Sequence, residues 1–94
     1  MTRRIEVEKL GEDEFQVRVI EGASQSLHRV TLSPNVFRQL AGGKAEPQEL
    51  VRRSFEFLLE HEPKESILGR FKLEEIGRYF PQFEREIKRR LSAA

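Results

Sequence analysis

The chain has no cysteine, no tryptophan and only two histidines among its 94 residues. Without cysteine it can form neither a disulfide framework nor a thiolate zinc site, so packing alone must hold the fold. No apolar run approaches the roughly 20 residues that a membrane helix needs. Residues 1–6 also lack the apolar core of a secretion signal. We therefore expect a cytoplasmic protein with no membrane contact.

An excess of charge of one sign is lacking as well. Seventeen Lys and Arg residues stand against sixteen Asp and Glu residues, which leaves a net charge of +1. The positive excess lies after residue 62, where eight basic residues accompany five acidic ones. A balance this even exerts no strong long-range attraction on nucleic acid.

What is present suits a small globular domain. The chain is 37% hydrophobic and 35% charged, and seven Phe residues provide most of the bulky core candidates. The length of the chain is enough to build a single hydrophobic core. We predict a single α+β domain over residues 1–94, with a β-meander at 1–33 and a helical part at 34–94.

Alternating apolar and polar side chains predict strands in the first third of the chain. Residues 3–10 and 14–20 both alternate in this way, and the turn-forming Gly11-Glu12-Asp13 joins them. A third strand is predicted at about 27–32, after a loop at 22–26. This order predicts a three-stranded antiparallel meander.

Two helices with clear ends follow the predicted strands. Ser33 and Pro34 are a favourable helix start, and Gly42-Gly43 ends this short helix after about two turns. A long core helix is predicted at 47–62, with apolar residues at helical spacing and a stop imposed by Pro63. Beyond it we predict two or three short C-terminal helices.

Several bulky side chains are candidates for an interface. Phe57 and Leu59 lie outside the main apolar stripe of the long helix, which predicts that this helix is covered on two sides, by the sheet and by another helix or subunit. Tyr79 and Phe83 add aromatic surface. A homodimer follows if the two-sided helix and the aromatic residues Tyr79, Phe80 and Phe83 exceed what one small sheet can cover, and a monomer follows if these aromatics belong to the core.

Residues that could carry catalysis are scarce. His28 and His61 do not have the spacing of a helical zinc motif. The acidic turn at 12–14 lacks the ligand pattern of a calcium loop, and Gly42-Gly43-Lys44 lacks the frame of a phosphate-binding loop. We predict no enzyme activity, no cofactor, no small-molecule substrate, and no catalytic or metal-binding residue.

Residues 29–60 contain a polar-apolar strand, a short helix, a glycine break and an amphipathic helix. This order resembles the ribbon-helix-helix DNA-binding proteins. The resemblance implies that two chains pair through this strand, and that the resulting ribbon enters the major groove. Arg29 and Thr31 would then read bases, while Arg52 and Arg53 would lie near phosphates. The two upstream strands offer the same strand a partner within its own chain instead.

A second resemblance covers more of the chain. It rests on Phe55-Glu56-Phe57-Leu58-Leu59-Glu60, Glu65-Ser66-Ile67-Leu68 and Tyr79-Phe80-Pro81-Gln82-Phe83-Glu84. These stretches look like a small bacterial protein family of uncharacterised function, which favours a prokaryotic cytosolic origin and implies no activity or site. The hairpin followed by a strand and a helix is also similar in outline to small antitoxins that bind a toxin through a β-rich half.

Two functional predictions follow from these features. The first is a non-enzymatic binding module that acts through contacts with a protein partner or a second copy in the bacterial cytoplasm. The alternative is a ribbon-helix-helix-like DNA-binding repressor or antitoxin. The two differ in whether the strand that begins near Arg29 pairs within its chain or across a dimer.

Overall fold

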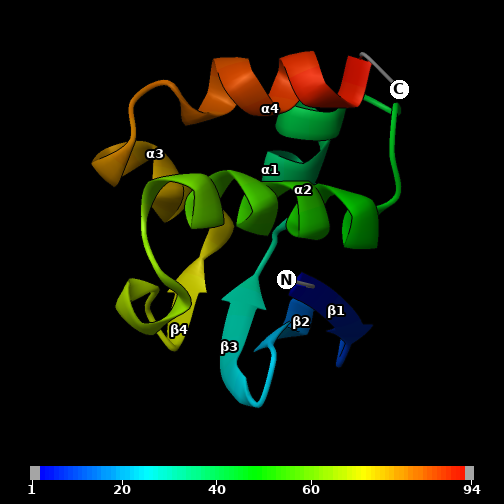
Figure 1. Cartoon of the computed structure of the whole chain (residues 1–94). Helices are drawn as coiled ribbons and strands as arrows, with labels where there is room; N and C mark the ends of the chain where they lie inside the picture. Colours follow the sequence, from blue (N-terminus) through cyan, green and yellow to red (C-terminus); the bar gives the residue numbers. More distant parts are fainter. Residues whose placement is uncertain (1–2, 93–94) are drawn as a thin grey trace.

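A four-stranded sheet forms one layer of the protein and carries helices on one face (Figure 1). The computed structural model describes residues 3–92. Strands β1 (Arg3–Lys9), β2 (Glu14–Glu21) and β3 (Ser24–Thr31) form an antiparallel meander. Strand β4 (Arg70–Lys72) adds to the free edge of β3 and runs parallel to it. The predicted α+β class and the meander of the first three strands are confirmed.

The sheet differs from the predicted one in two respects. The third strand begins at Ser24, because the chain reverses in a tight turn at Gly22 (φ 62°) and Ala23 rather than in a loop over 22–26. The fourth strand lies inside the part of the chain predicted to be helical. Its three residues are too few to show alternation, and Phe71 is its one buried side chain.

The helices α1 (Pro34–Ala41) and α2 (Pro47–His61) form where the sequence predicts them. Ser33 caps α1, since its Oγ accepts the Val36 N–H at 3.3 Å. Gly42 ends α1 with φ 55° and donates its N–H to the Arg38 carbonyl at 3.0 Å. Both predicted helix signals are therefore confirmed.

The C-terminal part contains the short helix α3 (Ile76–Tyr79) and the longer helix α4 (Phe83–Ser92). Two single 3-10 turns, Lys64–Ser66 and Leu73–Glu75, flank β4. Helix α4 begins two residues after Pro81, since the chain first turns at Pro81 and Gln82. In the described residues 3–92, none of these helices is long and apolar enough to cross a membrane.

Helix α2 lies between the sheet and α4 (Figure 1). Its buried residues are Leu50, Val51, Ser54, Phe55, Phe57, Leu58 and Leu59. The ring of Phe55 approaches Phe71 of the sheet at 6.0 Å, whereas the ring of Phe57 approaches Phe83 of α4 at 5.4 Å. The predicted cover on two sides is thus present, and the second side is supplied by the chain's own C-terminal helix.

Three of the four interface candidates are enclosed by the chain itself. Phe57, Leu59 and Phe83 are 1%, 8% and 2% exposed, whereas Tyr79 is 69% exposed. Phe57 and Phe83 are buried against each other because α4 folds back over α2, whereas Leu59 lies one turn after Phe55, on the side of α2 that faces the sheet. Of the four, Tyr79 alone presents a largely exposed side chain.

Substitution of Phe57 and of Tyr79 tests this distinction. We expect Phe57→Ala to lower the free energy of unfolding by about 3–5 kcal/mol, because it leaves a cavity between α2 and α4. Tyr79→Ala is the matched control and should change it by no more than about 0.5 kcal/mol. Urea unfolding followed by circular dichroism measures both. Equal effects of the two substitutions would contradict this assignment.

Candidate functional site

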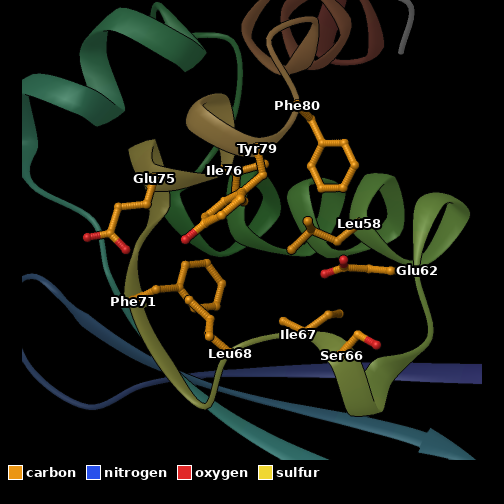
Figure 2. A pocket seen from close by; sticks show the side chains of 10 residues that line it. All are labelled: Leu58, Glu62, Ser66, Ile67, Leu68, Phe71, Glu75, Ile76, Tyr79 and Phe80. Carbon is orange, nitrogen blue, oxygen red and sulfur yellow. The ribbon is translucent and has the colours of Figure 1, made fainter.

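An apolar groove of about 310 Å³ opens at the C-terminal end of α2 (Figure 2). It lies between α2, the segment that follows Pro63, β4 and α3. The residues that line it are Leu58, Glu62, Ser66, Ile67, Leu68, Phe71, Glu75, Ile76, Tyr79 and Phe80. Leu68 is 51% exposed, so two large side chains, Leu68 and Tyr79, stand in solvent at a largely apolar hollow.

One wall of the groove is the segment between α2 and β4. Pro63 stops α2, and the chain then makes a single 3-10 turn in which Ser66 donates its N–H to the Pro63 carbonyl at 2.9 Å. Lys64 is buried and directs its ammonium to the carboxylates of Glu65 and Glu21, the latter at 3.5 Å. The hydrogen bond to Glu65 raises the pKa of Lys64 and lowers that of Glu65. This charged contact ties the wall to the end of β2.

His28 holds the same wall to β3. Its side chain is buried, with Nδ1 at 2.8 Å from the Leu68 carbonyl oxygen and Nε2 at 2.8 Å from Ser26 Oγ. Because a carbonyl oxygen can only accept, Nδ1 carries the proton and Nε2 accepts from the serine hydroxyl. The Arg29 N–H also donates to the Gly69 carbonyl at 2.8 Å. The His28 ring therefore positions the backbone from which the Leu68 side chain projects.

The opposite wall is α3 together with Phe80. The Phe80 N–H donates to the Ile76 carbonyl at 2.9 Å and closes this single turn. The Phe80 ring packs edge-on to Phe57 at 5.8 Å and also lies 5.1 Å from the ring of His61. These aromatic contacts fix the wall against the C-terminal end of α2, so both sides of the groove are held by specific contacts.

Two carboxylates lie at opposite ends of the groove, Glu75 at one end and Glu62 at the other (Figure 2). Both are half-buried. Within residues 3–92, neither carboxylate has a basic side chain within 4.0 Å. The groove therefore combines an apolar floor with negative charge that has no partner in the described part of the chain.

The structure does not bring the four predicted DNA-contacting residues onto one surface. Arg29 and Thr31 lie on the sheet face that points away from the helices, whereas Arg52 and Arg53 belong to α2 on the other face. Arg53 is engaged with Glu49 at 2.7 Å. Strand β3 pairs with β2 on one side and with β4 on the other. A ribbon between two chains would require one of these neighbours to leave.

The sequence-based predictions did not identify the groove. Its wall residues come from three separate stretches, and the exposed Leu68 has no periodic pattern around it that would mark it as surface. The sequence predicts Tyr79 as an interface residue, but only from its aromatic residue type. The nearest sequence signal is Pro63, which ends α2 where the groove opens.

Comparison with known proteins adds no relative. No protein-family model, no curated protein and no solved structure matches this chain. In the described residues 3–92, no three His, Asp or Glu side chains are grouped so that they could hold a metal ion. The geometry of the groove is therefore the main evidence on function.

Acidification tests the role of His28 in holding the groove wall. Burial lowers the pKa of His28 below its ordinary value of 6.5, although the bond to the Leu68 carbonyl opposes this. Below pH 6.5, unfolding is therefore accompanied by proton uptake at His28. The contribution of neutral His28 to the free energy of unfolding is complete above pH 6.5 and is lost as the pH falls toward the lowered pKa.

We expect His28→Gln to remove the part of the pH dependence of the unfolding free energy that comes from His28. It should also lower the unfolding free energy at about pH 7.5 by about 1–3 kcal/mol. Denaturation at about pH 7.5 and about pH 5.5, on either side of the ordinary histidine pKa, measures both effects. As a control, His61→Gln should keep the His28 contribution to the pH dependence. An unchanged pH dependence in His28→Gln would contradict the assignment.

A salt series tests the DNA-binding alternative. We expect no shift of mixed-sequence duplex DNA in a gel at low ionic strength, because the charge is balanced and β3 is paired on both edges. Binding that weakens steeply with added salt, and that weakens further in Arg29→Ala, would contradict this expectation. Lys44→Ala, an exposed basic residue away from the sheet, is the control.

Proposed function

We propose that this protein is a non-enzymatic protein-interaction module, and that the groove at the end of α2 binds a partner segment with apolar side chains and basic flanks. The observation that carries the proposal is the combination of an apolar hollow, two exposed large side chains and two carboxylates without a basic neighbour in residues 3–92.

The apolar floor supplies the attraction. Leu58, Ile67, Phe71 and Ile76 are buried at the base of the groove, while Tyr79 stands at its rim. Burial of a partner's apolar side chain here would add about 25 cal/mol for each Å² removed from water. Tyr is also enriched at interface sites that contribute most of the binding energy. An apolar anchor residue therefore fits this floor.

The size and charge of the groove indicate the kind of partner. At about 310 Å³ it lies near the lower end of the range of small-molecule pockets, roughly 300–1,000 Å³. It suits one or two side chains of a segment that lies across it. Because Glu75 and Glu62 are at opposite ends (Figure 2), a segment with Lys or Arg on both sides of its apolar residues would match both charges.

A random-peptide display library with the folded chain as bait tests this function. We expect enriched peptides to contain two or three large apolar residues flanked by Lys or Arg. Synthetic copies of these peptides should bind the double variant Glu62→Gln/Glu75→Gln about threefold to tenfold more weakly, as measured by fluorescence anisotropy. Leu68→Asp should weaken binding by about tenfold or more, since it places a charge on the apolar wall.

The control is Glu74→Gln, which removes the same charge from an exposed neighbour of Glu75 outside the groove. It should bind the peptides at least half as tightly as the parent chain. Circular dichroism shows that each variant is folded. No enrichment, or enriched peptides that bind Leu68→Asp as well as the parent chain, would refute the proposed function.

A further inference from the structure

Strand β1 forms one edge of the sheet and pairs with β2 along its whole length of seven residues. Its outer edge has no neighbouring strand in the described residues 3–92. Such an edge presents unpaired N–H and C=O groups that can accept another strand. The strand contains no Pro, and Ile5 and Val7 continue the apolar inner face of the sheet toward this edge.

The charges of β1 select a single way for two copies of the strand to pair. A two-fold axis normal to the sheet keeps α2 on the same side in both copies and places one residue of β1 opposite its own copy. With a charged residue at this centre (Arg3, Arg4, Glu6, Glu8 or Lys9), like charges meet directly. With Val7 at the centre, Glu6 of each copy lies opposite Glu8 of the other copy, which again opposes like charges. With Ile5 at the centre, Arg4 of each copy lies opposite Glu6 of the other copy, and no like charges are opposed.

We propose that this protein pairs with a second copy of itself through β1, in the antiparallel register that places Ile5 opposite Ile5. The pairing joins two four-stranded sheets into one. Arg4 of each copy then lies across from Glu6 of the other copy on the open face. The Ile5 pair extends the apolar inner face across the junction, and both free edges gain main-chain hydrogen bonds.

The surface beside β1 is compatible with a second copy. A shallow hollow between β1 and α2 is lined by Arg3, Arg4, Ile5, Arg52, Glu56 and Glu60. The two-fold axis brings the same hollow of the second copy to the other side of the junction, so that each hollow adds basic and acidic side chains beside the paired strands. Both signs of charge are present there, so this surface does not present one sign of charge to its own copy.

This contact is separate from the proposed peptide groove. The groove adjoins β4 and α3, whereas β1 is the opposite edge of the sheet. Both surfaces can be occupied in the same molecule. The dimer can therefore fail its test while the peptide groove stands, and the reverse also holds.

Sedimentation of the full chain over a concentration series tests the pairing. We expect the parent chain to reach twice the monomer mass of 11.0 kDa. Arg4→Glu and Glu6→Arg should each weaken the dimer by about tenfold or more, because each puts two like-charge pairs into the junction. The double variant R4E/E6R restores both opposite-charge pairs and should form a dimer again.

Mixing the two single variants separates contacts between chains from contacts within a chain. Arg4 Nε lies 3.1 Å from Glu6 Oε2 of its own chain, and Arg18 Nη1 lies 4.0 Å from Glu6 Oε1. Each substitution therefore also changes ion pairs within its own chain. In a mixture, the R4E chain is acidic at both positions and faces the E6R chain, which is basic at both. We expect a heterodimer at concentrations at which neither variant pairs alone, since mixing cannot repair contacts within a chain.

The controls carry the same charge changes away from β1, Lys44→Glu and Glu74→Arg, and should form dimers like the parent chain. Hydrogen exchange at β1 amides should slow as the concentration of the parent chain rises. A parent chain that stays monomeric throughout the series refutes the proposal. A dimer that is insensitive to Arg4→Glu and Glu6→Arg, or a mixture that forms no heterodimer, refutes pairing through β1.

Discussion

Helix α2 is apolar on two sides, and the need to bury both sides positions the other elements. The sheet can cover only one side of this helix, where Phe55 meets Phe71 and the ring of His28 at 5.3 Å. The other side carries Phe57, which needs a second layer. Helices α1 and α4 supply that layer, and α4 does so because Phe83, Ile87 and Leu91 share one buried face.

The groove is a consequence of where this central helix ends. Pro63 stops α2 before the apolar surface beneath its last turn is fully covered, and the chain then has to return to the sheet. Polar contacts guide that return. His28 binds the Leu68 carbonyl, and Lys64 pairs with Glu21. The apolar side chains of the returning segment are left to line an open hollow.

The same return explains the parallel fourth strand. Once the Arg29 N–H binds the Gly69 carbonyl, the next residues continue the pairing, so that Val30 lies beside Phe71 and Thr31 beside Lys72. This pairing occupies the second edge of β3 and leaves β1 as the long edge of the sheet. The helix stop at Pro63 therefore also determines which strand edge remains available to another chain.

The elements that carry local signals can be predicted from the amino-acid sequence. Alternation over 14–20 predicts a strand, Ser33 and Gly42 bound a helix, and the spacing of apolar residues predicts α2, because each of these depends on neighbouring residues alone. The burial of Phe57 and Phe83, the exposure of Tyr79 and the strand at residues 70–72 cannot be predicted in this way. Those outcomes depend on where α4 and the 63–69 segment come to rest, and contacts between distant parts of the chain set that position.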